Sequence, residues 1–257
     1  MKFFWCLWLG MMSATTSANS LLELYGHKNN ASLWTQRDLE IKEVADYMYR
    51  HYSLLMPTHG YIRQILSHDF LNKYNGQLYD SLSGNHLHPV AERQLELLSN
   101  HIDHYLQHLP TLEFTSYLPL YYPKAVIDRY QVGLGVYEPG FIRSYTNLPH
   151  AFSAQEEHFL QQVQMPELSQ EYVKVVAEIQ GKRGRILKKI MDPNTPMVLW
   201  PRQTHYKIEA KQYIEAENLY MFRYKEISAT EARALPRVIA SYSGHAVPNA
   251  LVECNSE

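Results

Sequence analysis

The feature that most limits the fold of this sequence is a change of pattern near residue 110. Before it, apolar residues recur at helical spacing and predict helices over 36–55, 61–74 and 89–110, the second of them ended by Asn75-Gly76. After it, short runs rich in β-branched and aromatic residues alternate with Pro, Gly and Asn, which is typical of strands. We place these strands at 112–121, 125–136, 140–146, 172–179, 197–200, 205–210 and 219–227. Helices followed by strands predict an α+β fold, because a doubly wound parallel sheet alternates the two.

The first eighteen residues have the pattern of a signal peptide. Lys2 is followed by the apolar run 3–12 and then by the small and polar residues 13–18. The run is about half as long as the roughly 20 residues that a membrane span needs, and no later stretch is long and apolar enough to span. The sequence therefore predicts an exported protein, periplasmic or secreted, that is cleaved near Ala18 and has no membrane span in the mature chain.

These patterns divide the chain into four segments. They are the signal peptide 1–18, a helical N-terminal lobe over 19–110, a β-sandwich core over 111–228 and a C-terminal tail over 229–257 that we expect to be loosely attached. Cys6 leaves with the signal peptide and Cys254 lies in the tail, so no internal disulfide is predicted. Stability must then come from burial of apolar surface.

Charge and motifs exclude several classes of function. The formal net charge is −2, which indicates no nucleic-acid or anionic-membrane partner. Neither a GxSxG motif nor a cysteine in an enzyme-like context is present, so a nucleophilic hydrolase is not indicated. Residues 180–185 (QGKRGR) bring three cations beside two glycines, but they lack the spacing of a phosphate-binding loop. We interpret them as a solvated basic loop between two strands.

Three histidines share one face of the third predicted helix. His101, His104 and His108 stand at i, i+3 and i+7, to the side of the apolar stripe. Imidazoles at this spacing can hold zinc, nickel or copper. No HExxH or CxxC pattern supplies a further ligand, so solvated surface histidines are the favoured interpretation and a metal site is the alternative.

A pair of carboxylates, Glu215 and Glu217, stands just before the last predicted strand. Side chains two apart on a strand point the same way, and such pairs can serve acid–base or ribose-binding roles. A solvated edge or turn is the ordinary interpretation.

Several stretches resemble a known family. The run VVAEIQGKRGRILKKIMDPNTPMVLWPRQTHYKIEAK (175–211) resembles the closing half of the arginine/serine/glutamate class of mono-ADP-ribosyltransferases, in which a core strand leads through a G-K-x-G turn to an E-x-E-V-L-F-P strand and a T-x-F-x-V strand. PGFIRSYTNLPHAFS (139–153) is similar to the segment with the family's Phe-x-Ser-Thr-Ser motif, and IDHYLQHLP (102–110) to the end of its helical lobe. Over residues 45–228, the resemblance implies a helical N-terminal lobe followed by a split, mainly antiparallel β-sandwich, with NAD as a possible substrate.

The chain departs from that family where the chemistry takes place. The position of the catalytic glutamate, directly before Val-Leu-Trp-Pro, is Met197, and the position two before it is Thr195. The arginine that grips the NAD phosphates falls on Tyr122 in one register and on Arg129 in another, and the Ser-Thr-Ser segment at 143–146 reads Arg-Ser-Tyr-Thr. The family's glutamate stabilises an oxocarbenium-like transition state, whereas a thioether has no charge and is a weak acceptor.

Two functions compete. The favoured one is an exported pseudoenzyme that requires no cofactor and binds a protein target or a nucleotide-like ligand through a degenerate cleft, with candidate contacts Tyr122, Arg129, Arg143, Tyr145 and Trp200. The alternative is an active transferase, a toxin or effector that uses NAD, with Arg129, Ser144 and either Glu217 or Glu215 as catalytic residues. Charge at the reacting ribose is hard to replace, which favours the first. An exported metal-binding protein that uses the three histidines is a further alternative.

Overall fold

The structure, a computed structural model, describes Leu21 and residues 68–84, 89–107, 109, 111, 113–154, 172–188 and 196–248. The predicted signal peptide, the predicted helix 36–55 and Cys254 lie outside the described residues. None of the helices within the described ranges is both long enough and apolar enough to cross a membrane.

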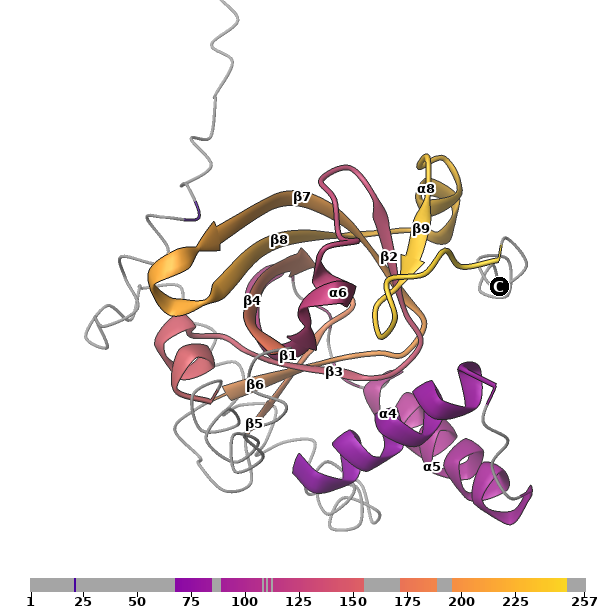
Figure 1. Ribbon diagram of the computed structural model, residues 1–257. Helices are drawn as coiled ribbons and strands as arrows, with labels where there is room; N and C mark the ends of the chain where they lie inside the picture. Colours follow the sequence, from indigo (N-terminus) through magenta and orange to yellow (C-terminus); the bar gives the residue numbers. More distant parts are fainter. Residues whose placement is uncertain are drawn as a thin grey trace, which may run out of the picture.

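Two helices, α4 (His68–Leu82) and α5 (Pro89–Gln107), pack together at one side of the sheet (Figure 1). Helix α5 begins at Pro89 as predicted, because the fixed φ of proline suits the first helical position. The predicted end of α4 is wrong, since the helix continues through Asn75 and Gly76. The Asn75 amide donates to the Phe141 carbonyl at 2.7 Å and accepts from the Phe141 N–H at 3.2 Å, and these tertiary bonds offset the roughly 1 kcal/mol that glycine costs inside a helix.

The strands form one mixed sheet in the order β5-β6-β3-β1-β4-β8-β7-β2-β9. Only the β4–β8 and β2–β9 pairs are parallel, so the prediction of a mainly antiparallel sheet is confirmed. The bounds are β1 (Phe114–Pro123), β2 (Gly135–Glu138), β3 (Ile142–Tyr145), β4 (Tyr172–Gly181), β5 (Arg185–Lys188), β6 (Pro196–Trp200), β7 (Thr204–Ile214), β8 (Leu219–Ile227) and β9 (Val238–Ala240).

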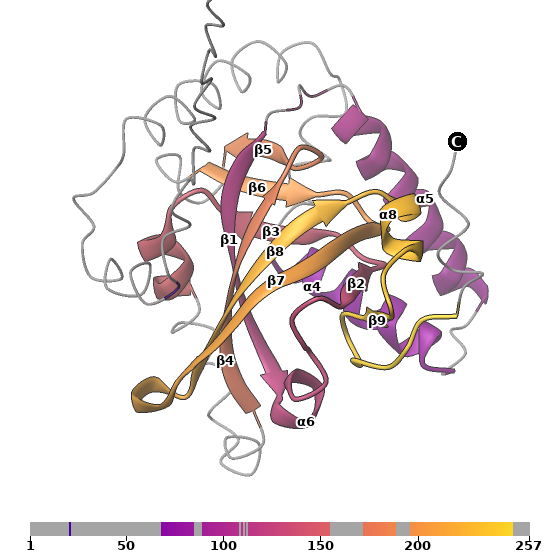
Figure 2. The ribbon, with the colours of Figure 1, turned by 90° about the horizontal axis from the view of Figure 1, so that it is seen from above.

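The sheet is strongly twisted (Figure 2), and its strands share a main apolar cluster. Every one of the nine strands contributes a buried side chain to the main cluster, including the fully buried Trp200, Ile208 and Phe222. Strands from distant positions in the sheet order therefore face one another across this core. In β4 the alternate residues Val173, Val175, Ala177 and Ile179 all join it, as the period of two predicts.

The sheet is split between β1 and β3. These two strands are joined at a single register pair, Tyr117 with Tyr145, whereas β1 pairs with β4 along its whole length. Beyond Tyr117, β1 has only one neighbour and diverges from β3. The opening that results positions the candidate site.

The predicted strand over 125–136 is wrong except for its last two residues, where β2 begins. Residues 124–127 form the short helix α6 (Lys124–Ile127), where Lys124 pairs with Asp128 at 2.8 Å. Gly133, with φ of 91°, then turns the chain into β2. The β-branched residues of this segment pack in the core and do not form a strand, since Ile127 belongs to the main apolar cluster.

The C-terminal segment is attached more firmly than expected. Helix α8 (Ala229–Arg233) begins at a capping box formed by Ser228 and Glu231, and β9 pairs in parallel with β2. Ile239 is fully buried. The expectation of a loose tail is therefore wrong for residues 229–248. The basic loop is also shorter than predicted, because Arg185 already begins β5.

Candidate functional site

A cavity of about 390 Å³ opens where β1 and β3 separate. Its wall is formed by α4, the second half of β1, the end of β2 and the start of β3, with side chains from β7 and β8. We call it the tyrosine cavity, because its aromatic lining is Tyr79, Tyr121, Tyr122, Tyr130, Phe141, Tyr145, Tyr206 and Tyr224. The charged residues of the lining are Glu138 and Arg143.

Glu138, at the end of β2, is 4% exposed. Its Oε1 accepts hydrogen bonds from the Tyr79 hydroxyl at 2.8 Å and from the Gly140 N–H at 2.7 Å. Burial raises the pKa of this carboxyl, while Ser241, Tyr79 and Gly140 act to lower it. A Cβ at Gly140 would lie 2.4 Å from Asn75 Oδ1, so only glycine allows this approach of α4 to the strand end.

The phenol groups gather around this carboxyl. Burial raises the pKa of each of five tyrosines, and a charge on Glu138 adds to the shift in all of them: Tyr79, Tyr122, Tyr130, Tyr206 and Tyr224. The Tyr130 hydroxyl donates to the Ser241 carbonyl. In the described part of the chain, the buried Tyr206 Oη and Ser241 Oγ make no hydrogen bond of standard geometry. The cavity is thus open to one side and lined by buried polar groups.

Met197 does not line this cavity, although its strand partner Tyr145 does. It is opposite Tyr145 in the β3–β6 pairing, and its side chain is 5% exposed. It belongs to a second apolar cluster beneath α4 and α5, with Leu71, Tyr74, Ile102, Tyr105, Leu106, Leu109, Phe141, Leu187 and Leu199. The position that corresponds to the family's glutamate is therefore in an apolar environment.

The predicted contact residues are divided between the cavity wall and the core. Tyr122, Arg143 and Tyr145 line the cavity. Trp200 is fully buried, and its Nε1–H is directed to the hydroxyl oxygens of Ser144 at 3.0 Å and Ser116 at 3.2 Å. The structure thus places Trp200 and Ser144 in a buried polar network inside the core and not at the cavity wall.

The predicted catalytic residues do not converge. Arg129 is exposed and donates to the Ser243 carbonyl at 2.7 Å, which ties the turn after α6 to the C-terminal segment. Glu215 and Glu217 lie in the 3-10 helix η1 (Glu215–Glu217) at the β7–β8 turn, in agreement with the ordinary interpretation of a solvated turn and not with a paired position on a strand. Neither they nor Arg129 line the tyrosine cavity.

The histidine cluster is only partly described. His104 is exposed on α5, whereas His108 and the side chain of His101 lie outside the described residues. Within the described ranges no group of three or more His, Cys, Asp or Glu side chains could hold a metal ion. The metal site stays a prediction.

A larger hollow of about 1310 Å³, the charged groove, lies between α5, the β4–β5 and β6–β7 turns, the end of β8 and the start of α8. Its lining includes Asp103, Glu113, Lys182, Arg183, Arg185, Arg202, His205, Lys225, Glu226 and Glu231. Opposite charges pair within it: Arg202 with Asp103 at 2.6 Å, Lys182 with Glu113 at 3.3 Å and Arg183 with Glu226 at 3.8 Å.

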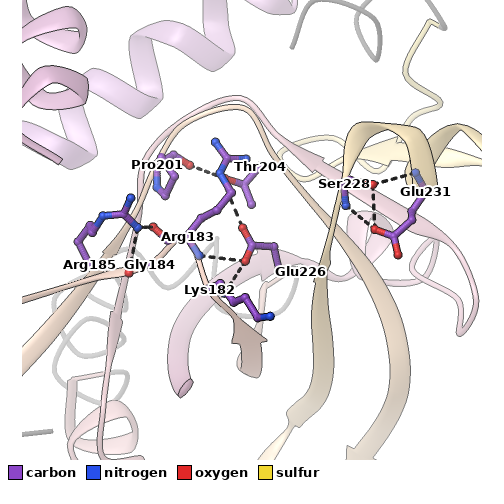
Figure 3. Close-up of polar contacts among 9 residues, drawn as sticks. All are labelled: Lys182, Arg183, Gly184, Arg185, Pro201, Thr204, Glu226, Ser228 and Glu231. Carbon is purple, nitrogen blue, oxygen red and sulfur yellow. Dashed lines mark hydrogen bonds and ion pairs between the residues drawn. The ribbon is translucent and has the colours of Figure 1, made fainter. Parts of the chain in front are cut away.

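Other polar groups of the charged groove form hydrogen bonds within the chain (Figure 3). Glu226 Oε2 accepts the backbone N–H groups of Lys182 at 2.6 Å and Arg183 at 3.0 Å. A Cβ at Gly181 would lie 2.4 Å from that oxygen, which explains the glycine. Glu231 caps α8 by accepting from Ser228. The groove is therefore charged and many of its polar groups have partners within the chain, but the buried Glu226 Oε1 and His205 Nε2 make no hydrogen bond with the described residues.

Comparison with known proteins identifies the fold. No protein-family model matches the sequence, and no curated protein matches it either. The Vis toxin, an ADP-ribosyltransferase from Vibrio splendidus, superposes with a TM-score of 0.61 at 18% identity, over 89% of this chain and 95% of that chain. Vis in complex with agmatine gives 0.66 at 16%, over 86% and 99%, and Vis in complex with M6 inhibitor gives 0.63 at 17%, over 89% and 95%. The chain has the ADP-ribosyltransferase fold, as the resemblance implied, and identities this low show the fold alone.

Proposed function

We propose that this chain is an exported protein of the ADP-ribosyltransferase fold that does not transfer ADP-ribose and instead binds a ligand in the tyrosine cavity. The observation that carries the proposal is the environment of Met197. This side chain is buried among apolar residues beneath α4 and α5, and it is not part of the cavity wall. A cleft with an apolar cluster in place of the family's carboxylate retains a binding surface without the charge that transfer needs.

The size of the electrostatic stabilisation that a glutamate would supply at this position supports the proposed loss of transfer. Electrostatic stabilisation of a transition state by one group is commonly worth about 3 to 4 kcal/mol, or roughly 10² to 10³ in rate. The thioether of Met197 cannot supply it, because it is uncharged and a weak acceptor. The proposed ligand is a protein target or a nucleotide-like molecule, and Tyr122, Arg143 and Tyr145 are the wall residues that would contact it.

The direct test is nicotinamide release from NAD, together with transfer of labelled ADP-ribose to proteins. We expect no turnover above background from the purified chain. Met197→Glu, which introduces the family residue, should not create activity and should lower the free energy of unfolding by about 3 kcal/mol or more, because it buries a charge among apolar side chains. Met197→Leu is the matched control and should change stability by less than about 1.5 kcal/mol. Turnover by the unmodified chain would overturn the proposal.

One observation favours a second candidate, an active transferase that acts as a toxin or effector and uses NAD. Glu138 places a carboxyl in the lining of the cavity, although it comes from β2 and not from β6. In this case Glu138→Gln, or Glu217→Ala for the carboxylate predicted from the sequence, would abolish measurable nicotinamide release. Under the favoured proposal both variants and the unmodified chain are equally inactive.

Export is part of the proposal and rests on residues 1–18, which lie outside the described residues. Expression of the full chain in a bacterial host, followed by fractionation and mass determination of the N-terminus, tests it. We expect a periplasmic or secreted product that begins near Asn19. An uncleaved chain confined to the cytosol would contradict export without affecting the proposal for the cavity.

A further inference from the structure

Residues 228–248, which we call the C-terminal strap, contribute to the wall of the tyrosine cavity. The strap contains α8 and β9, and β9 pairs in parallel with β2 (Figure 1). Ser241 lines the cavity, and its carbonyl accepts a hydrogen bond from the Tyr130 hydroxyl. Tyr242 stacks on Tyr79 of the same cavity, with ring centroids 5.0 Å apart. Detachment of the strap would therefore open the cavity.

The strap contributes little to the main apolar cluster. Among its described side chains, Ile239 belongs to that cluster, whereas Ala232, Val238 and Val247 pack in a small separate cluster with residues of β2 and β8. Segments with few contacts to the main core open at a lower free energy than the whole protein unfolds. The strap meets this condition.

His205 of β7 lies beside the strap, because α8 contacts β7. The residue is 2% exposed, its ring packs on Tyr137 of β2, and its Nε2 makes no hydrogen bond with the described residues. In the described part of the chain, the charged groups that shift its pKa are both basic: Arg183 from the β4–β5 turn and Arg233 from α8. A proton on this ring would place a third positive charge there, in a buried position.

The acids of the charged groove do not balance that charge. Glu226 accepts backbone N–H groups of the β4–β5 turn, and Glu231 accepts from Ser228 at the start of α8. Asp103 and Glu113 pair with basic side chains. None of the four is among the described groups that shift the pKa of the buried ring.

The other end of the strap depends on a second histidine. Arg129 Nη1, in the turn after α6, donates to the Ser243 carbonyl at 2.7 Å and lies 2.8 Å from His245 Nε2. A guanidinium only donates, so Nε2 must accept and the ring must be neutral. Protonation would set two donors against each other. Asp128, the acid next to Arg129 in the sequence, is paired with Lys124 at 2.8 Å.

We propose that the C-terminal strap is an acid-released closure of the tyrosine cavity, held while His205 and His245 are neutral and detached when they take up protons. Burial, together with Arg183 and Arg233, lowers the pKa of His205 from 6.5 to about 4. The stability that this ring gives to the closed strap is therefore complete above pH 6.5 and is lost as the pH falls towards 4. Linkage gives a factor of roughly ten to thirty in the ratio of detached to closed strap between about pH 8 and about pH 5 for this ring alone. The exposed His245 adds a smaller factor.

Two carboxyls at the strap do not produce this response. Burial raises the pKa of Glu138, whose carboxyl also interacts with Ser241, so proton uptake at Glu138 favours the closed cavity. Hydrogen bonds with Ser228 lower the pKa of Glu231, so it continues to cap α8 until the pH falls below its ordinary value of 4.5. The range between about pH 6.5 and about pH 5 therefore isolates the two histidines.

Hydrogen exchange of the purified chain, read by mass spectrometry and corrected for the intrinsic rates, tests the proposal. Between about pH 7.5 and about pH 5, we expect protection in peptides that cover 133–138 and 235–248 to fall by about tenfold or more. Protection of the paired strands β4 and β8 should stay unchanged. The double variant His205→Phe with His245→Gln retains a ring at one position and an acceptor at the other, but neither residue titrates. Its strap should stay protected at the lower pH.

His104→Gln is the matched control, because it removes an exposed histidine of α5 and should leave the acid response as it is. His205→Asn, a smaller neutral replacement, serves if the phenylalanine variant does not fold. Unchanged protection of the strap at the lower pH, or an equal loss of protection in β4 and β8, would overturn the inference in the unmodified chain alone. An acid response that persists in the double variant would overturn it as well. None of these readouts depends on whether the chain transfers ADP-ribose.

Discussion

The tyrosine cavity and the charged groove differ in what their charged groups contact. In the groove, Asp103, Glu113 and Glu226 each face a basic partner of the same chain. In the cavity, Glu138 accepts hydrogen bonds from a phenol and a backbone N–H, and no basic group is among the described residues that shift the pKa of its carboxyl. The groove is more than three times larger and carries far more charge, yet its interactions are mostly satisfied internally.

This difference teaches that the partner of a buried charge distinguishes the two regions better than volume or the number of charges. A buried polar group without a partner is rare in native proteins and has a cause. In the groove the charges join α5 to the β-turns, so they act on stability. Under the proposed function, the charged groups of the cavity contact a ligand, so they act on affinity. Substitutions in the two regions test this contrast, from the largest expected effect to the smallest.

The largest effect is expected at Arg202 in the groove. Its guanidinium donates to Asp103 at 2.6 Å, to Ser99 Oγ at 3.0 Å and to Asn100 Oδ1 at 3.0 Å, which ties the β6–β7 turn to α5. Arg202→Met removes all three bonds and leaves Asp103, whose pKa burial already raises, without its counter-ion. We expect the free energy of unfolding to fall by about 2 to 3 kcal/mol in urea titrations.

A loss of less than about 0.5 kcal/mol would show that the pairs of the groove do not stabilise the fold, and would remove the contrast between the two regions.

The next effect concerns His205, which lines the groove and packs on Tyr137 at 5.0 Å. Burial, together with Arg183 and Arg233, lowers its pKa from 6.5 to about 4. The folded state therefore holds the neutral ring where the unfolded chain binds a proton, so stability falls as pH drops from 6.5 towards 4 and changes no further below that. We expect a loss of about 2 kcal/mol over this range after allowance for solvent screening. His205→Phe, which retains a ring, should remove this part of the pH dependence measured by denaturation.

Much of the fold can be predicted from local patterns. The strand over 219–227 matches β8 at both ends, and the alternation from 173 to 179 places the core face of β4 correctly. The errors have tertiary causes. Helix α4 continues past Asn75 because that side chain bonds to the backbone of Phe141, 66 positions away, and no local rule detects such a partner.

The candidate site is harder to predict than the fold. Along β3, Arg143 and Tyr145 line the cavity, whereas Ser144 between them lies in the buried core. An error of one residue in the predicted register would therefore assign the cavity-lining residues to the core and the core residues to the cavity wall. No motif or spacing in the sequence marks Glu138 as a site residue. Its importance comes from the convergence of α4, β1, β2 and Ser241, which sequence spacing cannot reveal. The high count of 20 tyrosines was the visible signal, but it does not say which of them meet.

A smaller effect of opposite sign is expected at Glu138. Burial raises the pKa of this carboxyl above its ordinary value of 4.5, so the folded state binds a proton more tightly than the unfolded chain. Its contribution to stability is present below pH 4.5 and is lost as pH rises through the raised pKa. Glu138→Gln can still accept from Tyr79 and Gly140 but does not titrate. We expect the free energy of unfolding of the variant to rise relative to that of the unmodified chain as the pH increases from about 5 to about 8.

Denaturant titrations of both proteins across this pH range measure that gain. A parallel pH profile for Glu138→Gln and the unmodified chain would show that Glu138 has a basic partner after all, and would remove its difference from the carboxylates of the groove.

The smallest effect is expected for the pair of Lys182 and Glu113 at the rim of the groove. Their side chains are 71% and 72% exposed, and the two charged atoms lie 3.3 Å apart. Exposed pairs contribute about 0 to 1 kcal/mol and are screened by salt. Lys182→Gln should therefore change the free energy of unfolding by less than about 0.5 kcal/mol, with no difference at high salt. A loss as large as that of Arg202→Met would mean that burial is not what separates the strong pairs of the groove from the weak ones, and that the charge network acts as one unit.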